Sequence, residues 1–491
     1  MPRRHLRVSD TDGAALREAL TALRASLRVP AAFPPAVLAE AEEAARRGPD
    51  PALGPRDDAR DLPLFTIDPP TSVDLDQAVH LARRTAPDGS PRGYRVHYAI
   101  ADVAAFVRPG GALDTEAHHR VTTLYLPDGK VPLHPTVLSE DAASLLPDRE
   151  RAALLWRIDL DAEGRAVDTH VSRALVRSRA KLDYDGVQRA LDAGTAEEPL
   201  ALLAEIGRLR EDREAERGGV SLDVPEQEVV TRADGGYGLV YRAPLPADGW
   251  NAQISLLTGM AAADLMLRAG AGILRTLPLA PDGAVGRLRR SAKALGIDWP
   301  HHVSYAELIR SLDAHRPAHA AFLQECTTLL RGAGYTVFTD GRLPDPAVHA
   351  AVAAPYTHAT APLRRLVDRY AGELCLAAVA GREPPAWVTE ALPELPREMA
   401  EGNRTAGAVE RASVDLVEAA LLQGRVGETF RAVVIDVKDH EPTTGTVHLD
   451  EPAVVGRVEG GGPLPLGGSL RVRLTRADPA AKDGGVLFTP A

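Results

Sequence analysis

Cysteine is nearly absent from this chain of 491 residues, which contains only Cys326 and Cys375. Two cysteines cannot build the disulfide framework of a small secreted protein or a cysteine-rich zinc site. Because disulfides are rare in reducing compartments, this composition predicts a cytoplasmic protein.

Long apolar runs are missing as well. No stretch approaches the roughly 18 residues of a membrane-spanning helix. The start, MPRRHLRVSDTDG, is basic but lacks the apolar core of a secretory signal. We therefore expect no contact with a membrane, and we expect a monomer.

An excess of positive charge is the third feature that the chain lacks. Its formal net charge is −11 and its pI is about 5.8. Such a balance argues against a protein that binds nucleic acid over its whole surface. A basic channel inside an acidic exterior remains compatible with it.

The remaining composition is that of a globular protein, with 45% hydrophobic and 25% charged residues. Helical apolar spacing occurs at 12–27 and 35–48, and the Pro/Gly/Asp-rich stretch 48–61 predicts a boundary loop. Strand patterns follow, with one hairpin at 151–178 that turns at Ala162-Glu163-Gly164 and another at 226–243.

The second half of the chain changes character. From about Trp250 to Leu421, apolar residues recur at helical spacing. Residues 425–491 return to four or five short strands broken by glycine pairs, which is typical of a small OB-type barrel. The sequence therefore predicts an α+β fold in which a mixed sheet is followed by helices and by a small C-terminal barrel.

One acidic segment needs an explanation. TIDPPTSVDLDQA (66–78) places Asp68, Asp74 and Asp76 within nine positions, directly after an apolar run. Crowded carboxylates repel one another, so either the segment is a solvated loop with helix-capping aspartates or a cation lies among them. In extended geometry Asp74 and Asp76 project the same way. Oxygen ligands gathered like this suit Mg²⁺ or Mn²⁺.

The segment resembles the signature of the ribonuclease II (RNB) family, four aspartates spaced Asp-x5-Asp-x-Asp-Asp. The likeness continues in order through YAIADVAAFV, TTLYLPDG, AKLDYDGV, RGGVSLDVPE, YTHATAPLRRLVDRY and GNRTAGAVERASVDL. The resemblance implies an RNB catalytic domain over 61–422 and an OB-like RNA-binding barrel over 425–491. Residues 1–60 form a short helical segment, too short for the two cold-shock barrels of typical bacterial members.

In that family the aspartates hold metal, which implies that Asp68, Asp74 and Asp76 bind Mg²⁺, with Mn²⁺ as the alternative. Two such ions would activate a water and stabilise the leaving oxygen. Gln77 stands where the family has its fourth aspartate. Its amide oxygen is expected to be a weak, neutral ligand, so Gln77→Asp is expected to tighten Mg²⁺ binding. The alternative is a site adapted to the neutral amide, in which the same change adds repulsion among the aspartates and does harm.

The resemblance also implies roles outside the acidic segment. Arg364 matches the catalytic arginine, and Arg365 beside it is expected to contact RNA. Tyr125 and Tyr184 match aromatic residues of the RNA site, and Glu410 matches a glutamate that contacts the terminal ribose. The opposing aromatic of the family's base clamp should fall near Val229 and Val230, where none stands.

Each of these residues also has an ordinary structural interpretation. Arg364 and Arg365 fit a pair of solvated arginines at a helix start, and a lone tyrosine such as Tyr184 is usually half-buried packing. Glu410 fits an exposed helical glutamate paired with a neighbouring arginine. The histidines, among them His118, His119, His134 and His358, lack metal-ligand spacing.

The implied activity is degradation of single-stranded RNA from its 3′ end to 5′-nucleoside monophosphates, by a metal-dependent exoribonuclease with catalytic residues Asp76 and Arg364. The alternative is an RNB-fold RNA-binding protein whose catalysis is weakened or lost, with Gln77 as the trace of that loss. A phosphodiesterase for small substrates is a third possibility, against which the OB-like barrel argues.

Overall fold

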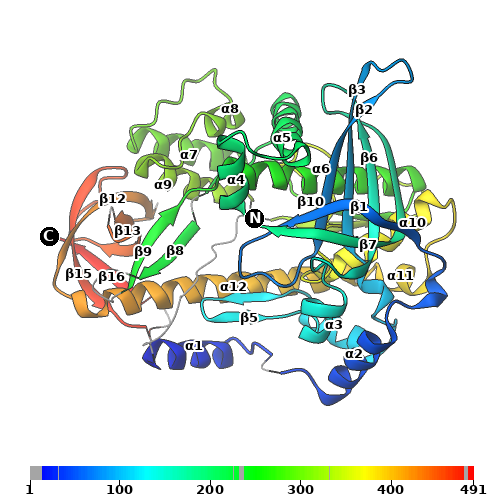
Figure 1. Cartoon of the computed structure of the whole chain (residues 1–491). Coiled ribbons are helices and arrows are strands. Elements are labelled where there is room, and N and C mark those ends of the chain that lie inside the picture. The colour runs from blue at the N-terminus through cyan, green and yellow to red at the C-terminus, as the bar shows by residue number, and fades with distance from the viewer. Residues whose placement is uncertain are drawn as a thin grey trace.

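The structure is a computed structural model, and it describes residues 14–30, 32–224, 226–231, 237–330, 332–438, 440–449, 451–479, 481 and 485–491. Within these residues, two closed β-barrels lie toward the two ends of the molecule, with helices between them (Figure 1). The fold is therefore the α+β arrangement with a small C-terminal barrel that the sequence predicts.

The first barrel contains the N-terminal strands, and its strand order is β1-β2-β3-β6-β7. The strands are β1 (Asp57–Ile67), β2 (Gln77–Thr85), β3 (Pro91–Ala101), β6 (Glu150–Leu160) and β7 (Ala166–Leu182). Neighbours are antiparallel except β1 and β7, which run parallel and close the barrel. The expected mixed sheet therefore has no open edge, and its polar groups gather on the loops at its rim.

The sequence of β3 first alternates between polar and apolar residues and then becomes continuously apolar, and the packing of the strand explains this change. Tyr98 and Ile100 enter a core cluster shared with several helices, whereas Ala99 and Ala101 enter a second cluster on the other face. A strand covered on both faces reads as one apolar run.

The N-terminal segment packs on the first barrel and on the long helix α12 (Leu395–Leu422). Helix α2 (Pro35–Arg47) buries Val37, Ala41 and Ala44 in the cluster that also contains Ala99. Helix α1 (Ala14–Ser26) lies along α12 and along a small hairpin of β4 (Leu124–Leu126) and β5 (Gly129–Val131) (Figure 1).

Helices fill the middle of the chain, together with two short two-stranded sheets. The elements are α3 (Ala112–Arg120), α4 (Tyr184–Asp192), α5 (Glu198–Glu216), β8 (Glu226–Thr231), β9 (Tyr237–Arg242), α6 (Pro246–Ala269), β10 (Gly272–Thr276), α7 (Asp282–Ala294), α8 (Tyr305–Arg310), α9 (Pro317–Cys326), β11 (Gly334–Phe338), α10 (Leu366–Val379), α11 (Ala386–Ala391) and α12. None of the helices in the described ranges combines the length and apolar character needed to cross a membrane.

Buried charges fix helix α10 against the first barrel. Asp102, which follows β3, accepts bonds from Arg56 Nη1 at 2.8 Å and from Arg173 Nε at 3.2 Å. Arg173 also pairs with Glu373 of α10. Removing one partner from such a buried network typically costs about 3–5 kcal/mol. The network therefore fixes the position of α10 against the barrel.

The C-terminal barrel has five strands in the order β12-β13-β14-β16-β15. They are β12 (Thr429–Lys438), β13 (Glu441–Leu449), β14 (Val455–Glu459), β15 (Ser469–Ala477) and β16 (Val486–Pro490). Val434, Val447, Val472 and Phe488 form its core and pack with the end of α12. The barrel that the glycine-broken strands predict is therefore present.

The structure also tests the smaller expectations. The hairpin predicted at 151–178 is formed by β6 and β7. The boundary loop predicted at 48–61 is wrong in its second half, because β1 begins at Asp57 and pairs there with β7. β8 and β9 pair as predicted, but the turn between them and the side chains of Val229 and Val230 lie outside the described part.

Candidate active site

The acidic segment forms the connection between β1 and β2 at the barrel rim. The Asp68 backbone N–H donates to the Leu182 carbonyl at the end of β7, at 3.1 Å. Ser144 fixes the middle of the connection: its hydroxyl donates to the Val73 carbonyl at 2.7 Å and accepts from the Leu75 N–H at 2.9 Å. The loop is therefore anchored at several points, which a freely solvated loop would not require.

Asp76 forms the central contact of the site. Its carboxylate accepts the Leu363 backbone N–H at 2.7 Å and Arg364 Nε at 3.0 Å. Burial raises the pKa of Asp76 to about 7, although Arg364 and the Leu363 N–H act in the opposite direction. Asp76 is almost fully buried, whereas 41% of the Arg364 side chain remains exposed. The guanidinium is thus oriented through Nε and open elsewhere.

The segment that carries Arg364 is held by the first turn of α10. Asp368 accepts the Ala361 N–H at 2.7 Å, and it forms two bonds with Arg365, at 2.5 and 2.7 Å. The Arg364 carbonyl accepts the hydroxyl of Thr122 at 3.0 Å. Arg365 is therefore turned toward α10, and its expected contact with RNA remains a prediction.

Asp68 differs from the other two aspartates in its surroundings. In the part of the chain that the structure describes, no hydrogen bond or ion pair to its carboxylate is found. Burial raises the pKa of Asp68 to about 6, with Arg364 and Lys181 opposing this and Asp74 adding to it. Asp74 itself forms an ion pair with Lys130 Nζ at 2.7 Å.

The amide of Gln77 makes hydrogen bonds at both ends. Its Nε2 donates to the Thr360 carbonyl at 2.7 Å, and its Oε1 accepts the Tyr98 hydroxyl at 2.6 Å. The Tyr98 hydroxyl in turn contacts Ser255 of α6 at 2.7 Å. Gln77 thus links β2, β3, α6 and the segment before Arg364, so its expected role as a metal ligand competes with these bonds.

The two tyrosines lie near the acidic loop. Tyr184, the first residue of α4, accepts a bond from Asn251 at 3.2 Å, and burial followed by the charge of Asp68 raises its pKa. Burial lowers the pKa of Arg364, but the charge of Asp76 raises it by more, and Tyr125 of β4 is the next group that acts on the guanidinium. Both sequence-predicted tyrosines are therefore brought to the site.

Glu410 lies on α12, beside Val409. Val409 packs with Leu124 and Leu126, the neighbours of Tyr125 in β4. This packing puts the α12 turn that bears Glu410 alongside the β4–β5 hairpin. The expected contact of Glu410 with the terminal ribose remains a prediction.

Several residues of the site escaped the motif-based prediction. Lys130 and Lys181 contact the acidic loop, Tyr98 holds Gln77, and Asp368 holds the Arg364 segment. One signal existed for the lysines, because the chain has only 5 lysines among its 57 basic residues. Tyr98 and Asp368 lie inside the quoted motifs YAIADVAAFV and YTHATAPLRRLVDRY, but neither motif gave them a role.

The donor chemistry can be compared with what Mg²⁺ requires. Within the residues that the structure describes, no three His, Cys, Asp or Glu side chains are close enough together to hold a metal ion. Mg²⁺ is commonly bound by only one or two carboxylates, with water and substrate phosphate oxygens completing its shell. Asp68 and Asp76 fit a site in which water and substrate phosphate complete the metal shell. They do not fit a cage made of protein ligands alone.

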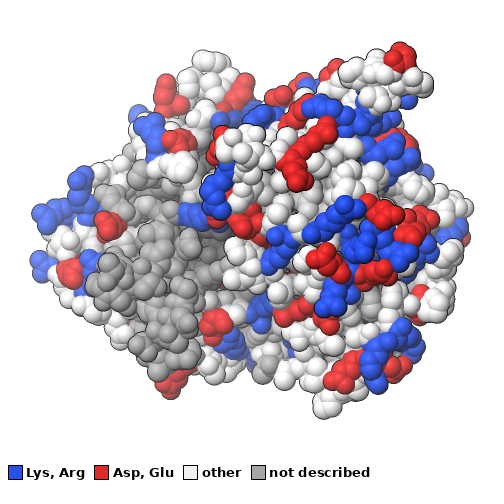
Figure 2. Space-filling view, in the orientation of Figure 1, with Lys and Arg blue, Asp and Glu red and all other residues white. Residues whose placement is uncertain are grey.

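Charge on the surface is mixed. Figure 2 shows Lys and Arg gathered over β1 and β7, interleaved with Asp and Glu. Arg60, for example, pairs with Asp58 at 2.7 Å and with Glu150 at 2.8 Å. This agrees with the net charge, which argues against RNA binding over the whole surface.

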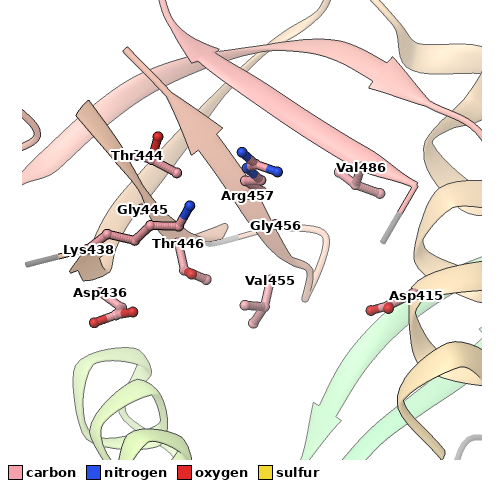
Figure 3. A pocket seen from close by; sticks show the side chains of 10 residues that line it. All are labelled: Asp415, Asp436, Lys438, Thr444, Gly445, Thr446, Val455, Gly456, Arg457 and Val486. Atoms are coloured by element: carbon pink, nitrogen blue, oxygen red, sulfur yellow. The ribbon is translucent and has the colours of Figure 1, made fainter. Parts of the chain in front are cut away.

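A cavity of about 290 Å³ lies on the C-terminal barrel, away from the acidic loop. Lys438 and Arg457 line it from β12 and β14, and Asp436 and Asp415 lie on opposite sides of it (Figure 3). Arg457 and Lys438 are paired with Glu459 and Glu441. Its mixed charges make it a less suitable phosphate site than Arg364.

Comparison with known proteins agrees with this architecture. The family model described as the RNB domain matches residues 56–380, and that described as the RNase II-type exonuclease C-terminal S1 domain matches residues 428–491. Because the first match covers more than half of the chain, the chain belongs to the RNB family and ends in an S1 domain of the RNase II type.

Curated relatives include Ribonuclease R of Escherichia coli, 28% identical over 435 residues that cover 83% of this chain and 52% of the relative. Ribonuclease R of Aquifex aeolicus is 26% identical over 425 residues, 83% of this chain and 59% of the relative. The chain thus spans between half and three fifths of these relatives. The Arabidopsis thaliana protein named Inactive exonuclease DIS3L2 is 43% identical over 146 residues, 29% of this chain and 13% of the relative.

Solved structures share the fold. Mycoplasma genitalium RNase R in complex with ribose-methylated single-stranded RNA has a TM-score of 0.82 at 20% identity, with 98% of this chain and 79% of that chain covered. Yeast Ssd1, described as a pseudonuclease, has a TM-score of 0.65 at 18% identity, with 84% and 52% covered. The fold therefore occurs in a named ribonuclease and in a named pseudonuclease.

Replacing Asp68 with asparagine is expected to stabilise the metal-free protein. A carboxyl whose folded pKa is raised from 3.8 to about 6 favours folding only when protonated, and that contribution is lost as the pH rises through 6. At pH 7.5, Asp68→Asn should therefore raise the free energy of unfolding by up to about 3 kcal/mol, at about 1.4 kcal/mol per pKa unit. Thermal denaturation in EDTA measures this.

The difference in free energy of unfolding between Asp68→Asn and the wild-type protein should become smaller as the pH falls from 6 to 4, because the wild-type carboxyl then becomes neutral. Asp212→Asn, at an exposed position on α5, is the matched control, and its free energy of unfolding should equal that of the wild-type protein. A destabilised Asp68→Asn protein at pH 7.5 would contradict the burial of an unpaired carboxylate.

The hydrogen bonds of Gln77 reverse the expectation for Gln77→Asp. A carboxylate cannot donate to the Thr360 carbonyl, and it adds repulsion beside Asp76. The variant should lose about 1–3 kcal/mol of stability, the usual cost of an unsatisfied buried partner, and should gain no affinity for Mg²⁺. Gln77→Glu, which keeps the side-chain length, is the comparison. Tighter Mg²⁺ binding by both acids with unchanged melting temperatures would restore the ligand role.

Proposed function

We propose that this chain is a metal-dependent exoribonuclease that hydrolyses single-stranded RNA from the 3′ end and releases 5′-nucleoside monophosphates. The observation that carries the proposal is the contact of Asp76 with the half-exposed Arg364, whose charge also acts on Asp68. Direction and product are inferred from the family, whose members include enzymes named Ribonuclease R.

Arg364 is the residue that would bind the scissile phosphate. Its Nε is occupied by Asp76, which leaves the terminal nitrogens on the exposed part of the side chain. A guanidinium with a fixed orientation forms strong, directional bonds with phosphoryl oxygens. Because the charge on those oxygens changes during displacement, a fixed cation there lowers the barrier.

The carboxylates account for the metal. Asp68 and Asp76 would hold Mg²⁺, with Mn²⁺ as a substitute, and the ion would supply a water of lowered pKa and stabilise charge on the oxygens. Burial of both carboxyls raises their pKa values, so the metal-free site favours protons at low pH. A bound cation would compete with these protons and keep both groups ionised.

The tyrosines would position the end of the RNA chain. Tyr125 lies on the hairpin that faces Arg364, and Tyr184 lies beside Asp68. Aromatic faces stack on any base, which suits an enzyme without sequence preference. The C-terminal barrel, an S1 domain, would hold the upstream RNA.

A second candidate function is RNA binding without hydrolysis. Two features of the site favour it: Gln77 replaces a carboxylate of the family motif, and Lys130 already pairs with Asp74. The named relatives include an inactive exonuclease and a pseudonuclease. Against it, Asp68, Asp76 and Arg364 are all retained, and loss of activity removes the pressure to retain them.

We further propose that the protein acts as a monomer in the cytoplasm. Both cysteines are buried free thiols, which suits a reducing compartment. The family relatives named Ribonuclease R are bacterial proteins, and the likeness to them supports a cytoplasmic location for this chain.

The decisive experiment incubates the purified protein with 5′-labelled oligoadenylate in Mg²⁺ and in EDTA. A ladder that shortens from the 3′ end only in Mg²⁺ supports the nuclease. Asp76→Asn should abolish the ladder but still shift the RNA in a gel, because Arg364 and the tyrosines remain. A shifted, intact RNA with the unchanged protein would identify the binding protein instead.

The adjacent arginines should respond differently to alanine. Arg364→Ala should lower kcat by about 10²–10³, the usual cost of removing a transition-state donor, and it should also lower the melting temperature, because the buried Asp76 loses its cation. Arg365→Ala should lower the melting temperature with much less loss of kcat, because it leaves the buried Asp368 without its charged partner but does not touch Asp76. Steady-state kinetics and thermal denaturation of both variants separate the two roles, and equal losses of kcat would contradict the assignment.

A further inference from the structure

Two lysines hold the acidic loop between β1 and β2. Lys181 Nζ donates to the Pro70 carbonyl at 2.6 Å and to the Ser72 carbonyl at 2.5 Å. Lys130 Nζ lies 2.7 Å from Asp74 and 2.9 Å from a second carboxylate, that of Glu140. Lys181 therefore binds backbone, and Lys130 binds side chains.

The choice of lysine at these positions is informative. The chain has 52 arginines and only 5 lysines, yet two of those five contact this one loop. Arginine is a planar fork suited to a single carboxylate, whereas an ammonium is a compact point charge with three rotatable donors. A compact charge between Asp74 and Glu140 does what a small cation does, since it neutralises two facing carboxylates.

Lys130 is also joined to the part of the site that would contact RNA. Lys130 of β5 lies directly opposite Tyr125 of β4, and directly opposed residues of a hairpin project from the same face. The far end of the hairpin is fixed by Arg24 of α1, which forms two bonds with Asp128, at 2.6 and 3.0 Å. The hairpin is thus fastened to α1 at its turn and to the acidic loop by Lys130.

We propose that Lys130 is a positioning residue that occupies Asp74 in place of a divalent cation and ties the Tyr125 hairpin to the acidic loop. Asp74 is then withheld from the metal. Asp68 is left to bind it, together with the lone pairs of Asp76 that Arg364 and the Leu363 N–H do not use. The inference deepens the proposed function and rests on it for the presence of a divalent cation at this loop.

The proposal has a consequence that a purely structural lysine would not have. Divalent-ion affinity rises with the number of negative ligands. Removing the ammonium frees Asp74 and adds one unbalanced negative charge, so metal binding should become tighter. The hairpin loses its tie at the same time, so binding of the RNA end should become weaker.

The test measures Mn²⁺ binding in the absence of RNA, by electron paramagnetic resonance of free Mn²⁺. Lys130→Met should tighten Mn²⁺ binding by about threefold to tenfold, because one ligand charge is released. Lys130→Arg should keep most of the wild-type value, since the positive charge remains. Lys293→Met, the same change at an exposed lysine of α7, should leave Mn²⁺ binding unchanged.

A second variant covers the case in which Lys130→Met fails to fold. Glu140→Gln removes the other partner of Lys130 and leaves the ammonium entirely to Asp74. Mn²⁺ binding should then become weaker, the opposite sign to Lys130→Met. Melting curves establish folding of each variant, and equilibrium binding of a short oligoadenylate in EDTA measures the tie to the hairpin, where Lys130→Met should lose affinity.

The outcomes separate this inference from the proposed function. If Lys130→Met and Glu140→Gln both leave the Mn²⁺ affinity within about twofold of wild type, ligand charge is not withheld and the inference is overturned. RNA hydrolysis by the same preparation would then still support the nuclease. If Mn²⁺ binding shifts in the two expected directions and no RNA is hydrolysed, the inference stands and the nuclease proposal fails. No Mn²⁺ binding by any form would overturn both.

Discussion

The contact between Asp76 and Arg364 joins two parts of the chain that are 288 positions apart. One partner follows the first strand of a closed barrel, and the other directly precedes helix α10. The contact exists only because the barrel closes through β1 and β7 and because Asp368 holds the arginine segment. Every role suggested for the site depends on the contact between the Asp76 carboxylate and the Arg364 guanidinium.

Burial of like charges is the cost of this arrangement. Asp68 and Asp76 both have raised pKa values because water is excluded from them, so the metal-free site opposes folding at neutral pH. Networks away from the site, such as Asp102 with Arg56 and Arg173, supply compensating order. Perturbed pKa values of this kind cluster at functional sites.

The number of carboxylates available to a cation separates this chain from the four-aspartate pattern. Gln77 is neutral and bonded to Thr360 and Tyr98, and Asp74 is paired with Lys130. Lys130 of the protein therefore neutralises one carboxylate of the acidic loop. Since the fold also occurs in a named pseudonuclease, the fold by itself does not decide between hydrolysis and binding.

Local order could be predicted from the sequence: the strand before Asp68, the hairpin that turns at Ala162-Glu163-Gly164, the helices after Trp250 and the C-terminal barrel. These follow from side-chain periodicity and turn residues, which act over a few positions. The resemblance to the RNB family also implied that Asp68, Asp76, Arg364, Tyr125 and Tyr184 belong to one site, and the structure places Arg364 against Asp76. The partners were decided only by the tertiary structure, including Lys130 on Asp74, Tyr98 on Gln77 and Asp368 on Arg365. A side chain's partner depends on which distant segments the closed barrel and α10 bring within about 3 Å of it, and no local pattern encodes that distance.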